Sequence, residues 1–125
     1  MLIVGAGFAG LSAARRLPRD VDVTVVDRSS WFEWLPNVHE LVSGVKRPRD
    51  LRLPLRRLVA QAGHRFVRAE IESIDARRGQ AVAVGGRSFA FDVCIVAAGG
   101  VDETFGVPGA RRYALPFKSV EECAA

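Results

Sequence analysis

The sequence predicts an α/β fold with a doubly wound parallel sheet and a small β-hairpin layer. Three observations carry this prediction. The chain opens with a short apolar run, Met1–Val4, that leads directly into a glycine-rich turn. A helical pattern and a β-branched run, Val21–Val26, follow in the order strand, helix, strand. A second continuous apolar run, Val93–Ala98, lies near the end. Such runs are typical of parallel strands that are covered on both faces.

The first elements form a compact βαβ unit. Leu11, Ala14 and Leu17 recur at helical spacing after the glycine turn, and Pro18 ends this helix. The β-branched second strand then ends at Asp27. The unit therefore places an acidic residue at the carboxyl end of its second strand.

The middle of the chain is predicted to be a looser crossover, from residue 29 to residue 63. It begins with an aromatic segment and continues with a helix over Val38–Val42, a basic loop broken by prolines, and a helix over Leu55–Ala62. The β-rich segment His64–Ile71 is predicted to be the third strand.

The last third is predicted to contain a β-hairpin and an irregular exit. Gln80–Val84 and Ser88–Phe91 can pair around a Gly-Gly turn. After the last apolar strand, prolines and glycines predict irregular structure. Ser119, followed by two glutamates, is typical of the start of a final helix.

Composition limits the class of protein. At 125 residues the chain is long enough for one domain, and its 49% hydrophobic and 26% charged residues are typical of a soluble globular protein. Neither a membrane span nor a signal peptide is evident, so we expect a cytoplasmic location. The net charge of +4 allows an anionic partner. We expect no nucleic acid, because the basic residues lack an aromatic stacking platform.

Gly5, Gly7 and Gly10 have the G-x-G-x-x-G spacing of a dinucleotide-binding loop. Gly5 permits the tight turn, Gly7 lets backbone amides reach a pyrophosphate, and Gly10 lets the helix pack closely on the strand. The positive end of the helix dipole favours the phosphate charge. The carboxylate of Asp27 can then accept hydrogen bonds from both ribose hydroxyls. Strand, loop, helix and acid together predict a Rossmann-like nucleotide site.

The acid also bears on the choice of nucleotide. A carboxylate at Asp27 would repel a 2′-phosphate, which disfavours NADP and leaves NAD or the adenosine half of FAD. Arg28, beside it, can either contact a phosphate or lie in solvent, and we favour the solvated arrangement.

Further motifs, in register along nearly the whole chain, resemble one family. They are Leu2–Leu11, Phe32–Glu40 followed by Gly44, Pro54–Arg56, Phe91–Gly99, Phe105–Gly109 and Ala114–Glu122. Together they resemble successive signatures of type II NADH dehydrogenases (NADH:quinone oxidoreductases) and their sulfide:quinone oxidoreductase relatives. These enzymes belong to the FAD-dependent pyridine nucleotide-disulfide oxidoreductase superfamily.

The resemblance implies FAD as the cofactor, with its pyrophosphate on the glycine loop and its ribose on Asp27. The adenine would lie against the backbone at residues 70–71, and the flavin ring would lie near residues 35–36. The chain at residues 98–99, at the second crossover, would pass close to the cofactor. The threonine that is usual in the family is alanine at position 98, which removes a hydroxyl but leaves the backbone role. The predicted cofactor-binding residues are Gly5, Ala6, Gly7, Phe8, Ala9, Gly10, Asp27, Arg28, Leu35, Pro36, Glu70, Ile71, Ala98 and Gly99.

The resemblance also implies a domain organisation. Residues 1–110 would be the N-terminal portion of an FAD-binding domain, and 111–125 the start of a linker toward an NADH-binding domain. The second glycine fingerprint and the late Gly-Asp segment of these enzymes do not follow Gly109. We therefore expect an incomplete FAD/NAD(P)-binding domain that is inactive alone. The complete enzyme would pass electrons from NADH through the flavin to a quinone or similar acceptor, with peripheral contact at the inner face of the membrane through further segments.

Several other residues have two open interpretations. The aromatic residues Trp31, Phe32 and Trp34 either line a flavin or quinone pocket or pack in a core. His39 is either a proton relay beside Glu40 or a structural histidine, and we favour the latter. The basic residues between 46 and 57 either meet acidic lipid or FAD phosphate, or form a solvated face. The sequence indicates no catalytic acid or base.

The cysteines bear on the choice between the relatives. Cys94 and Cys123 have neither the spacing of a redox pair nor that of a metal site. Cys94 is predicted to be a buried core residue. Sulfide oxidation and disulfide reduction require accessible thiols, so the cysteines favour the NADH:quinone function.

Two alternative functions stay open. One is a stand-alone NAD-binding Rossmann module, which has no reason to carry the Phe32–Glu40 motif. The other is a non-enzymatic truncated fragment that folds by association. Exposed surface where further segments would pack predicts a dimer or larger assembly.

Overall fold

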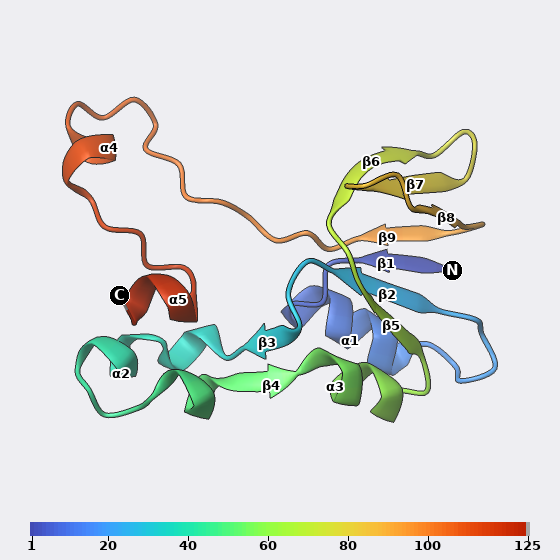
Figure 1. The fold of residues 1–125 in the computed structure, drawn as a ribbon, viewed down its shortest axis with the longest axis horizontal. Coiled ribbons are helices and arrows are strands. Elements are labelled where there is room, and N and C mark those ends of the chain that lie inside the picture. The colour runs from blue at the N-terminus through green and yellow to red at the C-terminus, as the bar shows by residue number, and fades with distance from the viewer. Residues whose placement is uncertain (125) are drawn as a thin grey trace. The chain divides into compact units, whose positions relative to one another are not determined.

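The computed structural model describes residues 1–124, and its contacts divide the chain into two compact units (Figure 1). Unit 1 comprises Met1–Phe32 and Pro54–Gly99. Unit 2 comprises Glu33–Leu53 and the described residues from Gly100 onward.

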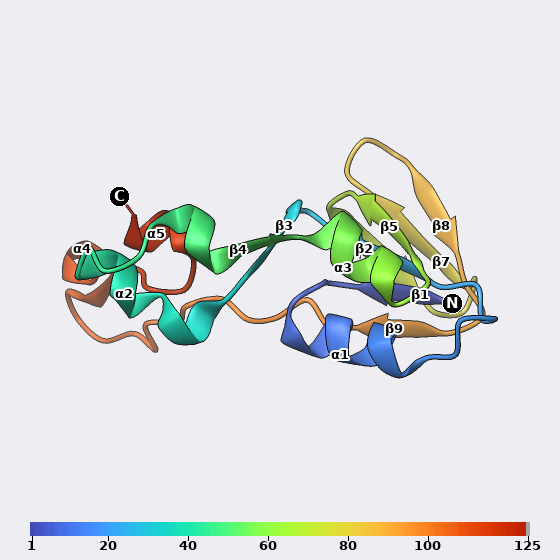
Figure 2. The same cartoon turned by 90° about the horizontal axis from the view of Figure 1, so that it is seen from below.

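Unit 1 is built on a four-stranded parallel sheet of order β5-β2-β1-β9 (Figure 2). Its pairing is in register: Ile3 lies between Val25 of β2 and Ile95 of β9. The fold class predicted from the sequence, α/β with a parallel sheet, is confirmed. The four strands are β1 (Leu2–Val4), β2 (Thr24–Asp27), β5 (Arg65–Arg68) and β9 (Cys94–Val96).

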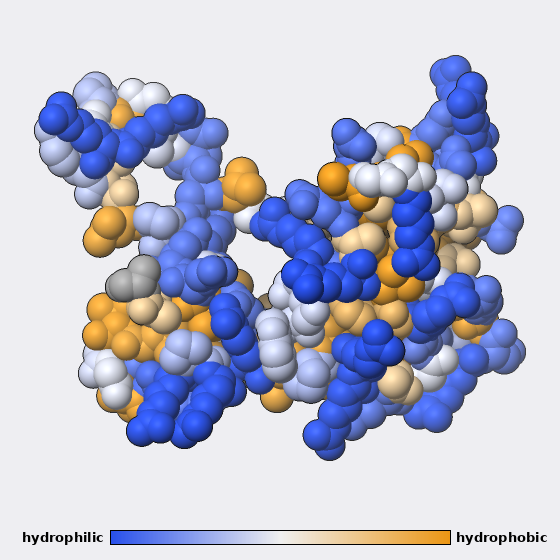
Figure 3. Space-filling view, viewed as in Figure 1, coloured by the Kyte–Doolittle hydropathy of each residue, from blue (hydrophilic) through white to orange (hydrophobic). Residues whose placement is uncertain are grey.

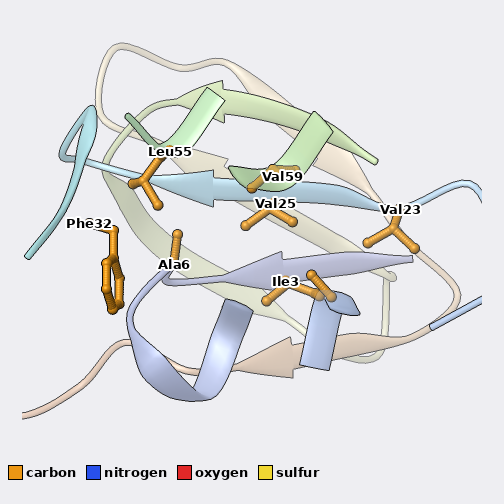
Figure 4. Close-up of a cluster of buried hydrophobic side chains, with 8 residues drawn as sticks. Ile3, Ala6, Val23, Val25, Phe32, Leu55 and Val59 are labelled. Carbon is orange, nitrogen blue, oxygen red and sulfur yellow. The ribbon is translucent and has the colours of Figure 1, made fainter. Parts of the chain in front are cut away.

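Two helices cover one face of this sheet. The helices α1 (Phe8–Arg16) and α3 (Leu55–Gln61) contribute apolar side chains to a core that includes Ile3 and Val25 (Figure 4). These two strand residues and Val59 of α3 are completely buried. The predicted helix over residues 55–62 is thus confirmed, and Leu55 and Val59 form its buried stripe because they are four residues apart.

A three-stranded antiparallel sheet supplies the residues that cover the other face. Its strands are β6 (Ile71–Asp75), β7 (Gln80–Ala83) and β8 (Ser88–Ala90), in that order. Ala81 of β7 packs with Leu2, Val4 and Val26 of the parallel sheet. The predicted hairpin between β7 and β8 is confirmed.

The predicted third strand, His64–Ile71, is wrong in its extent, because it is two strands. β5 ends at Arg68 and β6 begins at Ile71. Between them, the Ala69 N–H donates to the Asp27 carbonyl at 2.9 Å, whereas the Glu70 carbonyl accepts from the Val84 N–H at 2.8 Å. The chain therefore changes its partner from the parallel to the antiparallel sheet within two residues.

His64, for which the sequence indicates no function, lies directly before β5 and contacts helix α1. Its side chain is 8% exposed, and Nε2 lies 3.0 Å from the carbonyl of Ala14 near the end of α1. Nδ1 is buried without a hydrogen-bond partner among residues 1–124. Since a carbonyl only accepts, Nε2 is the donor in this contact.

The crossover contains short elements. A two-stranded sheet, absent from the sequence-based prediction, consists of β3 (Trp31–Glu33) and β4 (Arg52–Pro54). The predicted helix over 38–42 is confirmed as α2 (His39–Val42), which is preceded by a 3₁₀ helix, η1 (Leu35–Asn37). The remaining elements are η2 (Pro48–Leu51), α4 (Ala110–Tyr113) and α5 (Val120–Cys123).

The helix predicted to start at Ser119 is confirmed as α5. The Ser119 hydroxyl accepts a hydrogen bond from the Glu122 N–H at 3.1 Å, which is an N-cap. Val120 and Cys123 of α5 are buried, as are Val38 and Leu51. These four side chains form the buried part of unit 2, which is small.

Glu33 links distant parts of unit 2. Its Oε1 lies 2.9 Å from both Nε and Nη2 of Arg52, and its Oε2 accepts from the Val120 N–H at 2.9 Å. Both side chains of the ion pair are more than two-thirds buried, so solvent screens the interaction only partly. The carboxylate thereby holds the start of α5.

We expect Glu33→Gln to destabilise unit 2 by about 1–2 kcal/mol, because the ion pair with Arg52 is lost. The matched control is Glu121→Gln, which alters an exposed glutamate on the same helix as Val120. Amide hydrogen exchange should show faster exchange at Val120 in the first variant only. Equal exchange rates in both variants would contradict this role.

Unit 2 exposes large apolar side chains. Val101, Phe105 and Leu115 are 83%, 88% and 90% exposed, so they contribute little to its core. Figure 3 shows apolar residues beside hydrophilic ones on the visible face of the chain. Among residues 1–124, no helix has the length and apolar character that a bilayer-spanning segment requires.

Candidate nucleotide-binding site

The first glycine of the fingerprint occupies a turn that only glycine fits. Gly5 follows β1 with a φ of 97°, and its N–H donates to the Val26 carbonyl at 2.8 Å. A Cβ at this position would lie 2.1 Å from the Ala97 carbonyl oxygen and 3.0 Å from the Ala98 Cα. The turn is therefore packed directly against the segment that leaves β9.

The third glycine allows α1 to approach this turn. A Cβ at Gly10 would lie 1.9 Å from the Gly5 carbonyl oxygen, which is far inside van der Waals contact. Gly10 is buried, as is Ala6. The prediction that Gly10 serves close helix packing agrees with this geometry.

The middle glycine has a different environment. Gly7 is the N-cap of α1, with a φ of −74°, and a Cβ there would meet no atom within 4 Å among the described residues. Gly7, Phe8 and Ala9 are exposed, and no side chain in residues 1–124 caps the helix. The first N–H groups of a helix lack intrahelical partners. This end of α1 is thus open to an approaching anion, whose charge the helix dipole favours.

Asp27 lies at the end of β2, beside the glycine loop. Its Oδ2 accepts from the Ala6 N–H at 2.7 Å, and its Oδ1 accepts from the Ser29 N–H at 2.8 Å. No ion pair involves Asp27 within residues 1–124. Each carboxylate oxygen can accept a further hydrogen bond. The acid is therefore held by two backbone amides while it keeps the capacity to accept from two hydroxyls.

Other predicted residues lie at the same edge of the parallel sheet. Ala98 and Gly99 follow β9 and are exposed, and the Ala97 N–H donates to the Val4 carbonyl at 2.7 Å. Glu70 and Ile71 follow β5, two to three residues beyond Arg68. Because the carboxyl ends of parallel strands meet at one edge, unit 1 brings these segments to the edge where nucleotides bind in such sheets.

The aromatic residues are placed differently from one another. Phe8 is 45% exposed and its ring meets that of Phe32 edge to face, with 4.9 Å between centroids. Phe32 is only 7% exposed and is part of the core of unit 1. Trp31 and Trp34 are about half exposed, and Trp34 Nε1 donates to Asn37 Oδ1 at 2.7 Å. Phe32 is therefore a core residue.

Leu35 and Pro36, predicted near the flavin ring, belong to unit 2. They form the start of η1 and are exposed. Their role toward a cofactor stays a prediction, because they do not belong to the unit that contains the glycine loop.

Glu40, considered beside His39 as part of a proton relay, is engaged in an ion pair. The Lys46 ammonium lies 2.9 Å from its Oε2 and lowers the pKa of the Glu40 carboxyl. Glu40 is therefore ionised at neutral pH, which does not suit a proton donor. Among residues 1–124, no group of three histidine, cysteine or acidic side chains can hold a metal ion.

The prediction that Cys94 is a buried core residue is wrong in its extent, because Cys94 packs against the core that contains Leu2 and Ala81 but is not fully buried. Cys94 is only partly buried, because β9 is at the edge of the four-stranded sheet. Cys123 is buried, and both thiols are free. Burial raises the pKa of the Cys94 thiol, and burial, followed by the Glu122 and Glu33 carboxylates, raises the pKa of the Cys123 thiol.

Both thiols should therefore be protonated at neutral pH and react slowly with Ellman's reagent. We expect rates at pH 7 roughly tenfold below that of glutathione, rising on denaturation, because the thiolate is the nucleophile. The variants Cys94→Ser and Cys123→Ser each keep one thiol, so they show which rate belongs to which cysteine. A thiol that reacts faster than glutathione at pH 7 would contradict the inert role of these cysteines.

Known proteins resemble this chain in sequence and in fold. A family model described as pyridine nucleotide-disulphide oxidoreductase matches residues 1–125. The type II NADH:quinone oxidoreductase of Staphylococcus haemolyticus is 28% identical over 97% of this chain and 31% of the relative. That of Staphylococcus saprophyticus is 30% identical over 96% and 31%. The chain spans about 31% of the length of these curated relatives.

Solved structures share the fold. The sulfide:quinone oxidoreductase of Aquifex aeolicus has a TM-score of 0.86 at 22% identity, over 98% of this chain and 29% of that one. NDH2 from Plasmodium falciparum, in complex with NADH, has a TM-score of 0.83 at 19% identity, over 98% and 26%. The family match over the whole chain, together with this fold, shows that the chain belongs to the pyridine nucleotide-disulphide oxidoreductase family.

Proposed function

We propose that this chain binds the adenosine diphosphate half of FAD and contributes it to the flavin site of an NADH:quinone-type oxidoreductase. Residues 1–110 are the N-terminal portion of the FAD-binding domain, and 111–125 begin a linker toward an NADH-binding domain. The parent protein is an enzyme, whereas this chain alone is inactive.

One observation supports this proposal above the others. The Asp27 carboxylate accepts from the Ala6 N–H at 2.7 Å, one residue before the open face of Gly7. An acceptor for ribose hydroxyls and an uncapped helix end for phosphates are therefore adjacent. The donors and acceptors present fit an adenosine diphosphate group.

Each group of residues has a distinct role in this proposal. The amides at the start of α1 bind the pyrophosphate, the Asp27 carboxylate accepts from the ribose hydroxyls, and the backbone at 70–71 holds the adenine. Ala98 and Gly99 approach the cofactor at the crossover, and Leu35 and Pro36 lie near the flavin ring. FAD, when bound, supplies two-electron transfer between a nicotinamide and an acceptor. The residues of this chain bind and orient; none donates or removes a proton.

The activity of the complete protein is part of the same proposal. The curated relatives are named type II NADH:quinone oxidoreductases. NADH binds in a further domain and a quinone or similar acceptor takes the electrons, in the cytoplasm or at the inner face of the membrane.

Near-ultraviolet and visible absorption together test the cofactor. The chain is incubated with FAD or with NADH, desalted and scanned, and its fold is checked by circular dichroism. Retained flavin absorption supports the proposal. Binding of NADH with no flavin supports the stand-alone NAD module instead, and a folded chain that binds neither, but forms a dimer, supports the associating fragment.

A further inference from the structure

A contact at the end of β5 fixes the turn that carries Asp27. Arg68 is the last residue of β5 and pairs in register with Asp27, the last residue of β2. Its Nε donates to the carbonyl of Arg28 at 3.0 Å. Two residues 40 positions apart are thereby joined at the carboxyl edge of the sheet.

The turn after β2 has further internal hydrogen bonds. Asp27 Oδ1 accepts from the Ser29 N–H at 2.8 Å, and the Ser29 hydroxyl accepts from the Trp31 N–H at 3.0 Å. These hydrogen bonds fix the turn from within. The Arg68 side chain adds a hydrogen bond to the Arg28 carbonyl of the same turn. The direction of the Asp27 carboxylate is therefore set before any ligand arrives, and such preorganisation lowers the entropic cost of binding.

Arg68 retains unused donors. Its terminal guanidinium nitrogens have no hydrogen-bond or ion-pair partner among residues 1–124, and its side chain is exposed. In particular, Arg68 forms no ion pair with Asp27 in the described part of the chain. The carboxylate is therefore not neutralised by a protein cation and stays available to hydroxyl donors.

We propose that Arg68 is a positioning residue for the adenosine end of this site. It acts through the Arg28 carbonyl on the turn that presents Asp27, so its effect is confined to the adenosine end of the cofactor. The inference rests on the proposed function. Neither the glycine fingerprint nor the acid at the end of β2 identifies Arg68 as part of the site.

The test uses ADP and FMN as separate probes of the two halves of FAD. ADP contains the adenosine and pyrophosphate, whereas FMN contains only the flavin half. Calorimetric titrations compare the unaltered chain with Arg68→Ala, Arg68→Lys and the control Arg77→Ala. Arg77 is exposed on the turn between β6 and β7 and its side chain has no partner among residues 1–124, so its variant matches the change in charge.

We expect Arg68→Ala to weaken ADP binding roughly five- to tenfold, the effect of one charged hydrogen bond at an exposed position. Arg68→Lys keeps a donor and should restore affinity to within roughly threefold, whereas a purely steric role would not be rescued. FMN binding should be the same in all variants, and Arg77→Ala should match the unaltered chain.

The outcomes separate this inference from the function on which it rests. If the unaltered chain binds ADP and Arg68→Ala binds it as tightly as Arg77→Ala does, the positioning role is overturned while the proposed function stands. If the unaltered chain binds neither ADP nor FAD, both are overturned. Circular dichroism establishes that each variant is folded, and if Arg68→Ala is not, the comparison of Arg68→Lys with Arg77→Ala decides.

Discussion

Replacement of Asp27 by alanine is expected to weaken FAD binding roughly a hundredfold. Two hydroxyl hydrogen bonds to a carboxylate, each worth about 1.5 kcal/mol, are lost at once, and about 1.4 kcal/mol corresponds to a factor of ten. The Ala6 and Ser29 N–H groups also lose their acceptor, so the glycine loop and the turn after β2 become less ordered. Fluorescence titration with FAD, at constant salt, measures the effect.

Asp27→Asn separates the charge from the shape. The amide keeps one acceptor oxygen but presents N–H donors to a backbone N–H, so one of the two contacts is lost. We expect affinity between those of the unaltered chain and Asp27→Ala. If all three proteins bind FAD equally, the carboxylate does not contact the ligand.

The second large effect is expected at Gly10. Gly10→Ala should prevent folding or lower stability by more than about 3 kcal/mol, because its Cβ would overlap the Gly5 carbonyl oxygen at 1.9 Å. Relief requires that α1 move away from β1, which would open the core around Ile3. Thermal unfolding followed by circular dichroism measures the loss.

Gly7→Ala is the matched control in the same loop. A Cβ there meets nothing within 4 Å, and its φ of −74° suits alanine, so the melting temperature should change by only about 2 °C. The added methyl group would instead occupy the space that a pyrophosphate needs, and FAD binding should fall roughly tenfold or more. If both alanine variants are equally stable, the close packing of α1 assigned to Gly10 is wrong. If Gly7→Ala binds FAD as tightly as the unaltered chain does, the pyrophosphate does not lie next to Gly7.

The parallel sheet and its glycine loop could be predicted from the sequence because their signals are local. β1 is a continuous apolar run, β2 lies in a β-branched run, and the three glycines between them have the spacing of a dinucleotide-binding loop. The same is true of α5, where a serine before two glutamates predicted the N-cap that Ser119 forms.

The features that the sequence did not predict depend on tertiary partners. The break between β5 and β6 follows from the change of hydrogen-bond partner at Ala69 and Glu70, which no local pattern reveals. The partial exposure of Cys94 follows from the position of β9 at the sheet edge, whereas an apolar run alone suggests burial.

The sequence indicated that the glycine loop and Asp27 lie together, but it did not indicate their hydrogen bonds. Spacing indicated the glycines and Asp27, yet the bond from the Ala6 N–H to the carboxylate depends on the register of β1 and β2. The link from Arg68 to Arg28 likewise requires that β5 pair with β2, which a sequence does not state.

The most direct test of the central claim is a heteronuclear NMR titration of the ¹⁵N-labelled chain with FAD. We expect saturable shifts of the amide signals of Ala6, Gly7 and Ser29, which surround the Asp27 carboxylate and the start of α1. Weaker shifts should follow at Ile71 and Gly99. If FAD leaves the glycine-loop amides unchanged, or shifts only signals outside these segments, the assignment of this edge of the sheet as the cofactor site is wrong.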